Sequence, residues 1–132
     1  MPSYSGQKAA SQYRKLGLQG EIQSASAHRL IQMLFEGALE QLNKAHFALE
    51  QGDLAGKGHH IGRAIDIVSG LRQSLDIDSG DLAAQLDSLY QYCEFILLEA
   101  SRHNNLSQLQ EVARLLTTLK SGWDGIAPEA KA

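Results

Sequence analysis

The sequence has very little proline and cysteine, and each scarcity excludes a class of structure. Its two prolines, Pro2 and Pro128, stand near opposite ends of the 132 residues, so no proline interrupts a helix between them. The one cysteine, Cys93, has no partner for an internal disulfide. It falls within an apolar helical pattern, where a small buried side chain is the expected interpretation. The composition therefore permits long helices and excludes an internal disulfide framework.

Long apolar runs and a large excess of one charge are also missing. The longest uninterrupted apolar run, residues 95–98, is far shorter than the roughly 20 residues that cross a bilayer. The net charge of −3 argues against bulk attraction to nucleic acid or to an anionic membrane. The opening residues M-P-S-Y-S-G-Q-K contain no apolar secretory core. We therefore expect a cytoplasmic protein with no nucleic-acid partner and no membrane insertion.

Motifs for catalysis and metal binding are absent as well. No glutamate is followed by histidine three residues later, the spacing by which helical bundles hold paired metal ions. The sequence has no Gly-rich phosphate loop with its lysine, no G-x-S-x-G, no C-x-x-C and no H-E-x-x-H. We expect a protein that is not an enzyme, with no catalytic residues, no metal site and no cofactor.

What the sequence does contain is a series of amphipathic segments, of which the first covers about residues 26–51. Ser26 is its N-cap candidate, and Gly52 is suited to the left-handed conformation that ends a helix. Its apolar residues recur at three- and four-residue steps: Leu30, Ile31, Leu34, Phe35, Ala38, Leu42, Ala45 and Leu49. So wide a stripe has two interpretations: a helix central to the core, or a surface for an amphipathic helix of another protein.

Three further helices are predicted at about 54–76, 82–103 and 108–124. Ser107, with Gln110 three residues later, is typical of a capping box at the start of the last helix. No segment shows the alternation of a strand bounded by hairpin turns. Helices of this length joined by short connections predict an all-α fold, an antiparallel up-and-down four-helix bundle.

The predicted domain organisation is a bundle over residues 24–127, an N-terminal arm over 1–23 and a flexible tail over 128–132. The arm is poor in apolar residues and is expected to be partly flexible. Its few apolar side chains leave two alternatives open: a mobile tail, or a loosely held arm that docks on a groove.

Residues 24–37, S-A-S-A-H-R-L-I-Q-M-L-F-E-G, resemble the opening of the first long helix in FliS-type flagellar secretion chaperones. The resemblance continues at 50–53 (E-Q-G-D), 64–68 (A-I-D-I-V), 89–92 (L-Y-Q-Y) and 123–126 (W-D-G-I). Tyr13 and Leu16 resemble the N-terminal Tyr-x-x-Val element of the family. One departure is the apolar run at 95–98, where an Arg-Arg-Leu-type segment is usual.

The resemblance implies a cytoplasmic chaperone that binds the disordered C-terminal segment of flagellin before export. Binding would prevent premature polymerisation and keep flagellin competent for type III secretion in flagellum biogenesis. The expected complex holds one client segment, with release at the flagellar export apparatus as a further partner. A homodimer without the client is compatible with this role.

For the binding of the client we expect Tyr13 and Leu16, which the family element supplies and which would compete with client side chains for the groove. Weaker candidates come from the second and third helices, where ordinary core packing is an equal alternative: Ile65, Val68, Leu71, Leu86, Leu89 and Tyr90. The alternative function is a self-associating structural or regulatory bundle without a flagellin client. A small metal-dependent enzyme is a third and weaker hypothesis.

Overall fold

The computed structural model describes residues 4–17 and 26–126, and all regular secondary structure in these ranges is helical. The elements are α1 (Gly6–Lys15), α2 (Ala27–Glu50), α3 (Leu54–Gln73), the 3₁₀ helix η1 (Ile77–Ser79), α4 (Asp81–His103) and α5 (Leu106–Asp124). The predicted all-α class is confirmed. The predicted tail at 128–132, the parts of the predicted arm at 1–3 and 18–23, and residues 24, 25 and 127 of the predicted bundle lie outside the described residues.

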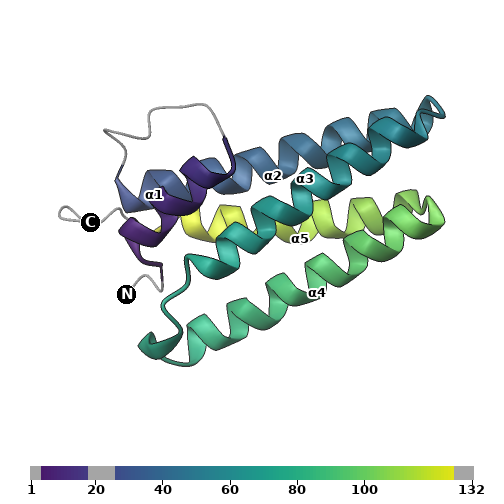
Figure 1. Ribbon diagram of the computed structural model, residues 1–132. Helices are drawn as coiled ribbons and strands as arrows, with labels where there is room; N and C mark the ends of the chain where they lie inside the picture. Colours follow the sequence, from purple (N-terminus) through teal and green to yellow (C-terminus); the bar gives the residue numbers. More distant parts are fainter. Residues whose placement is uncertain (1–3, 18–25, 127–132) are drawn as a thin grey trace.

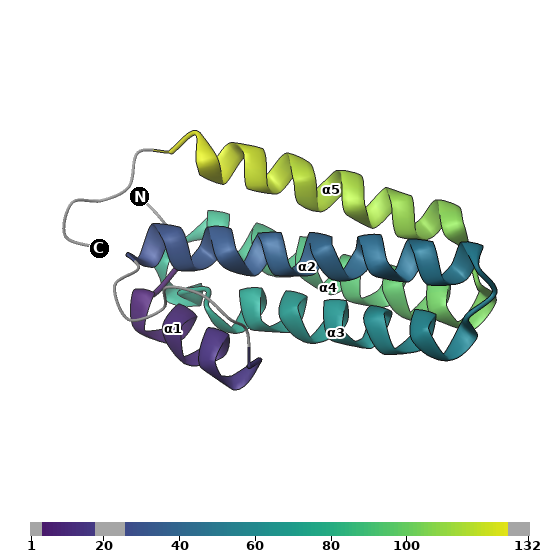
Figure 2. The same ribbon diagram turned by 90° about the horizontal axis from the view of Figure 1, so that it is seen from above.

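The helices pack side by side around one core (Figures 1 and 2). α2 lies along α3 and α5, and α4 lies along the same two helices from the other side. α1 lies against α2 and α3. One end of this bundle therefore gathers α1, the start of α2, the end of α3, the start of α4 and the end of α5.

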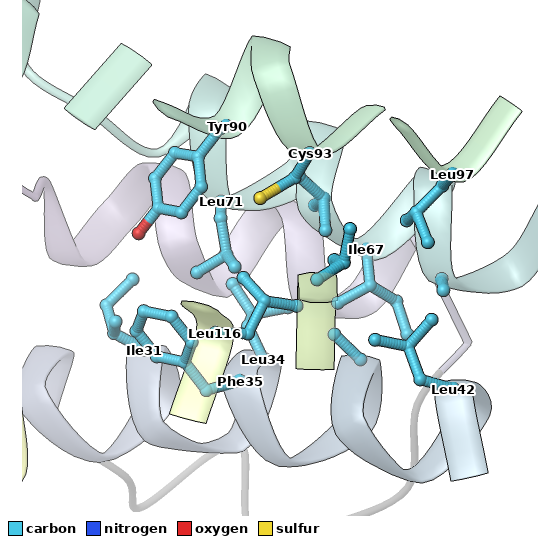
Figure 3. Packing of buried hydrophobic residues seen from close by; sticks show 14 of the residues in the cluster. Ile31, Leu34, Phe35, Leu42, Ile67, Leu71, Tyr90, Cys93, Leu97 and Leu116 are labelled. Atoms are coloured by element: carbon cyan, nitrogen blue, oxygen red, sulfur yellow. The ribbon is translucent and has the colours of Figure 1, made fainter. Parts of the chain in front are cut away.

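The central position of α2 explains its wide apolar stripe. Ile31 and Leu34 are fully buried, because α2 is in contact with α1, α3 and α5. Figure 3 shows these side chains meeting Leu71 of α3, Tyr90 of α4 and Leu116 of α5. The first interpretation of the stripe, a helix central to the core, therefore accounts for α2 without a partner.

The start of α2 and its end at Gly52 form as the sequence predicts. The Ser26 hydroxyl caps the start of α2 by accepting a hydrogen bond from the Arg29 backbone N–H at 3.1 Å. Gly52 takes the left-handed conformation with φ of 75°. The Asp53 carboxylate then caps α3 by accepting from the Gly56 backbone N–H at 2.9 Å. Each cap satisfies a backbone donor that the first turn of a helix leaves unpaired.

The predicted capping box at Ser107 and Gln110 is wrong, because α5 begins earlier. Its N-cap is Asn105, whose side-chain oxygen accepts a hydrogen bond from the Gln108 backbone N–H at 3.1 Å. Asn104 ends α4 in the left-handed conformation with φ of 52°, which leaves Asn105 extended and ready to cap. Asparagine tolerates this conformation better than most residues, so two asparagines suffice for the whole connection.

The helix α1 was not expected within the arm. The Ser5 hydroxyl caps it by accepting from the Lys8 backbone N–H at 3.3 Å, and Ala9 and Tyr13 are its buried residues. Gly6 permits a close approach to α2, since a Cβ there would lie 2.9 Å from the Ala27 Cβ. Two buried residues one turn apart give too weak a periodic signal to predict a helix.

Polar contacts join the later helices. The Arg72 guanidinium of α3 bridges the carboxylates of Asp87 and Glu94 on α4, at 3.0 and 2.9 Å. Its hydrogen bond holds the pKa of Asp87 below the ordinary value. The Lys57 ammonium donates to the Ser101 carbonyl at 2.7 Å, farther along the same pair of helices. These contacts fix the register of α3 against α4.

The end of α5 is anchored on the start of α2 by Trp123. Its indole N–H donates to the His28 carbonyl at 2.9 Å, and its ring stacks on the His28 ring with centroids 5.0 Å apart. Beside it the Gln32 amide donates to the Asp124 carboxylate at 2.8 Å.

Two alanine variants distinguish the observed N-cap of α5, Asn105, from the expected one, Ser107. Asn105→Ala should lower the free energy of unfolding by about 1 kcal/mol, because the Gln108 N–H loses its acceptor. Ser107→Ala removes an exposed hydroxyl that donates to the Asn105 Oδ1 at 2.9 Å, but the cap keeps its bond from the Gln108 N–H, so the effect should be much smaller. Urea denaturation followed by circular dichroism measures both. Equal losses in the two variants would contradict the assignment of the cap.

The Trp123 anchor is tested by Trp123→Phe. This variant keeps an aromatic ring but removes the indole N–H that donates to the buried His28 carbonyl, so the free energy of unfolding should fall by about 1 kcal/mol. Tyr92→Phe is the control, since its hydroxyl lies at the surface against Glu111. Urea denaturation again provides the measurement, and a loss no larger than the control's would show that the anchor contributes little.

Candidate partner-binding groove

An apolar groove of about 280 Å³ opens between the first half of α4 and the last half of α5, at the end of the bundle where α1 docks. We call it the end groove. Its lining residues come from four parts of the chain: Tyr4, Phe35, Leu82, Leu86, Tyr90, Thr118, Leu119, Gly122, Trp123 and Ile126. Most of these side chains are apolar, so the groove suits apolar side chains of a partner.

The floor and the rim of the end groove differ in exposure. Phe35, Tyr90 and Trp123 are buried and form the floor. At the rim, Leu82 is 54% exposed and Ile126 is 45% exposed. Apolar side chains held at the mouth of an apolar groove are typical of a surface that a partner covers.

Tyr4 closes the inner side of the groove. Its ring packs edge-on against the Trp123 ring with centroids 5.0 Å apart, and its hydroxyl forms a hydrogen bond with the Tyr90 hydroxyl. Burial raises the pKa of Tyr4 and also that of Tyr90, so both phenols are neutral at physiological pH. The pair is therefore a neutral hydrogen bond within an apolar surround.

The backbone around Tyr4 is held to the end of α3. An isolated β-bridge pairs Tyr4 with Leu75, and the Ser5 N–H donates to the Ser74 carbonyl at 2.9 Å. The Lys8 ammonium donates to the Leu75 carbonyl at 3.3 Å. Residues 4–8 thus attach to the protein mainly through backbone carbonyls, which any extended segment with suitable donors can use.

The structure brings two of the eight expected binding residues, Leu86 and Tyr90, to the end groove. Leu89 and Ile65 are half-buried and do not line it. Val68 and Leu71 are fully buried in the core. In this conformation those two side chains present no surface to a partner.

The two residues expected from the arm do not line the end groove: Tyr13 lies on α1, and Leu16 is the C-cap of that helix. Tyr13 is buried. Leu16 is half-buried and packs on α3 at Gly70. A Cβ added to Gly70 would lie 3.1 Å from the Leu16 Cδ1. The Arg63 guanidinium donates to the Leu16 carbonyl at 3.2 Å and fixes this end of α1.

Sequence reasoning missed Tyr4 and did not recognise the rim residues Leu82 and Ile126 as exposed. Tyr4 had a signal: it is the first aromatic side chain in a polar stretch. Leu82 and Ile126 continue apolar helical patterns past the last layer of the core, and a sequence does not show where a core ends. Only the structure shows that Leu82 and Ile126 are exposed.

The described residues hold no group of three or more His, Cys, Asp or Glu side chains placed to bind a metal ion. Burial raises the pKa of the Cys93 thiol to about 12, so it is protonated and inert as a nucleophile. Among the helices of the described residues, none is both long and apolar enough to cross a membrane. The chemistry of the end groove is that of an apolar binding surface.

Comparison with known proteins agrees with this picture. The family described as "Flagellar protein FliS" matches residues 9–130. The flagellar secretion chaperone FliSB of Pseudomonas aeruginosa PAO1 is 46% identical over 121 residues, which cover 91% of this chain and 96% of that protein. The flagellar secretion chaperone FliS of Salmonella typhimurium LT2 is 39% identical, over 98% of this chain and 96% of its own length. That of Vibrio cholerae is 36% identical, over 89% and 87%.

The family match covers α1 from Ala9 onward and every lining residue of the end groove except Tyr4, which precedes the matched region. The relatives are named as chaperones, which act by binding rather than by catalysis. The chain belongs to the FliS family of flagellar secretion chaperones.

Proposed function

We propose that the chain is a cytoplasmic export chaperone that binds the disordered C-terminal segment of flagellin and prevents its premature polymerisation. In this proposal α2–α5 are the antiparallel up-and-down bundle, α1 belongs to the arm, and the end groove receives part of the client. The observation that carries the proposal is an apolar groove with an exposed apolar rim, partly filled by the chain's own Tyr4. Membership of a flagellar secretion chaperone family supplies the biological context.

The geometry fits a client that becomes helical on binding. A groove between two helices accepts the apolar side chains that an amphipathic helix presents at three- and four-residue intervals. The end groove has room for a few such side chains. A disordered segment loses conformational entropy when it orders, so the whole complex needs a contact area larger than this groove alone.

Exposure and position support an order among the proposed client contacts. Leu82, Leu86 and Ile126 supply apolar surface at the end groove. Ile65 and Leu89, both half-buried, are secondary candidates outside it. Leu16 is half-buried as well, and a client would reach Tyr13, Val68 or Leu71 only if the elements that bury them move.

The proposal is tested by titrating the chain with the C-terminal segment of flagellin from the same organism. Calorimetry should give one segment per chain, and circular dichroism should show a gain of helicity beyond the sum of the two components. Absence of binding together with a stable homodimer would contradict the proposal and favour the self-associating bundle. A flagellin segment from which the C-terminal residues have been removed serves as the negative control.

The end groove itself is tested by a charge at its rim. Leu82→Lys should weaken binding of the flagellin segment at least tenfold, because the ammonium would have to be desolvated against an apolar partner.

Leu98→Lys is the matched control for that variant. Leu98 lies on the same helix, is 53% exposed and does not line the groove. Its variant should bind like the unaltered chain. Equal losses in the two variants would place the client elsewhere on α4, over the apolar run at 95–98.

A further inference from the structure

The Tyr90 hydroxyl is a buried polar atom at the floor of a mostly apolar groove. The Tyr90 side chain is fully buried, and Figure 3 shows its ring reaching from α4 into the core toward Phe35. Among the described residues, its hydroxyl has one hydrogen-bond partner, the hydroxyl of Tyr4. A buried hydroxyl that loses its partner costs free energy unless another polar group replaces it.

The Tyr90 hydroxyl would lose its partner Tyr4 if the client enters this part of the groove. Tyr4 lines the groove together with Tyr90 and Trp123, so a side chain seated deep in it would take the place of the Tyr4 ring. The Tyr4 phenol then moves into water, where its hydroxyl is hydrated at little cost. The Tyr90 hydroxyl stays behind in the protein and needs a new partner.

We propose that Tyr90 determines which client residue is accepted at the end groove: the partner replaces Tyr4 with a side chain that hydrogen-bonds the Tyr90 hydroxyl. The inference rests on the proposed function and names the chemistry of the anchor residue. A tyrosine reproduces the contacts of Tyr4, with an aromatic edge toward Trp123 and a hydroxyl toward Tyr90. Asparagine, glutamine, serine and threonine supply the hydrogen bond without the ring. Leucine and phenylalanine fill the space and leave Tyr90 unpaired.

A cycle of phenylalanine variants in the full chain tests this inference. Tyr4→Phe leaves the Tyr90 hydroxyl unpaired in the free chaperone only, so binding of the flagellin C-terminal segment should become about tenfold tighter. Tyr4→Phe combined with Tyr90→Phe removes both hydroxyls, so neither hydroxyl is left without a hydrogen-bond partner in the free chaperone. In its complex the client's polar anchor is then unpaired, so binding should be about tenfold weaker than for the unaltered chain.

If the client residue that replaces Tyr4 is apolar, the double variant should not bind more weakly than the unaltered chain. The client would then meet a fully apolar floor, and affinity would equal or exceed that of the unaltered chain. That result would overturn the inference. Unchanged affinity in the single Tyr4→Phe variant would also overturn it, because Tyr4 would not be displaced. Fluorescence anisotropy of a labelled segment provides the affinities.

The one tryptophan in the sequence gives a second readout of displacement. Because Tyr4 packs on the Trp123 ring, its replacement by a client residue should shift the Trp123 emission on binding. The matched control is Tyr92→Phe. Tyr92 lies on α4, as Tyr90 does, and its exposed side chain donates a hydrogen bond to the Glu111 carboxylate. This variant should bind the flagellin segment with the affinity of the unaltered chain.

The same assay separates the two proposals. If the unaltered chain does not bind the flagellin segment, the proposed function fails, and the anchor inference falls with it. If the unaltered chain binds the segment and the double variant binds as well or better, only the anchor inference fails.

Discussion

The burial of α2 by three neighbouring helices is the constraint on which the rest of the structure depends. Its apolar residues cover more than one face, so no single partner helix could shield them from water. Contacts with α1, α3 and α5 together remove them from solvent. This demand explains why α5 must return to the start of α2, where Trp123 bonds the His28 carbonyl, and why α1 gains a place on the outer side.

Much of this fold follows from local rules that a sequence displays. The Ser26 cap and the Gly52 turn were predicted because each depends on residues within four positions, and the Asp53 cap is equally local. The start of α5 was not, because Ser107 and Asn105 are both good caps and the left-handed Asn104 decided between them. α1 was missed for a different reason: its stability comes from contacts with α2 and α3, which are distant in sequence.

The end groove illustrates what periodicity cannot supply. Leu86 and Tyr90 were expected at a binding surface, and so were Val68 and Leu71. Tyr90 is as fully buried as those two, yet it lines the groove and they do not. A stripe gives the direction that a side chain faces and not the depth of protein above it. Depth depends on where the neighbouring helices end, and at this end of the bundle they leave Leu82 and Ile126 uncovered.

The contacts of the arm at the end groove are few, as the proposed function requires of a segment that a client replaces. Tyr4 is joined to the protein by one hydroxyl pair, one ring contact and a few backbone bonds, and α1 buries only Ala9 and Tyr13. Segments with so few buried contacts open at low free-energy cost. The apparent affinity of a client that needs the open form falls by the fraction of molecules that are open. Under the proposed function, an arm held by these contacts would cover the apolar groove in the free chaperone while costing the client little affinity, and a longer apolar arm would cover it better only by excluding the client.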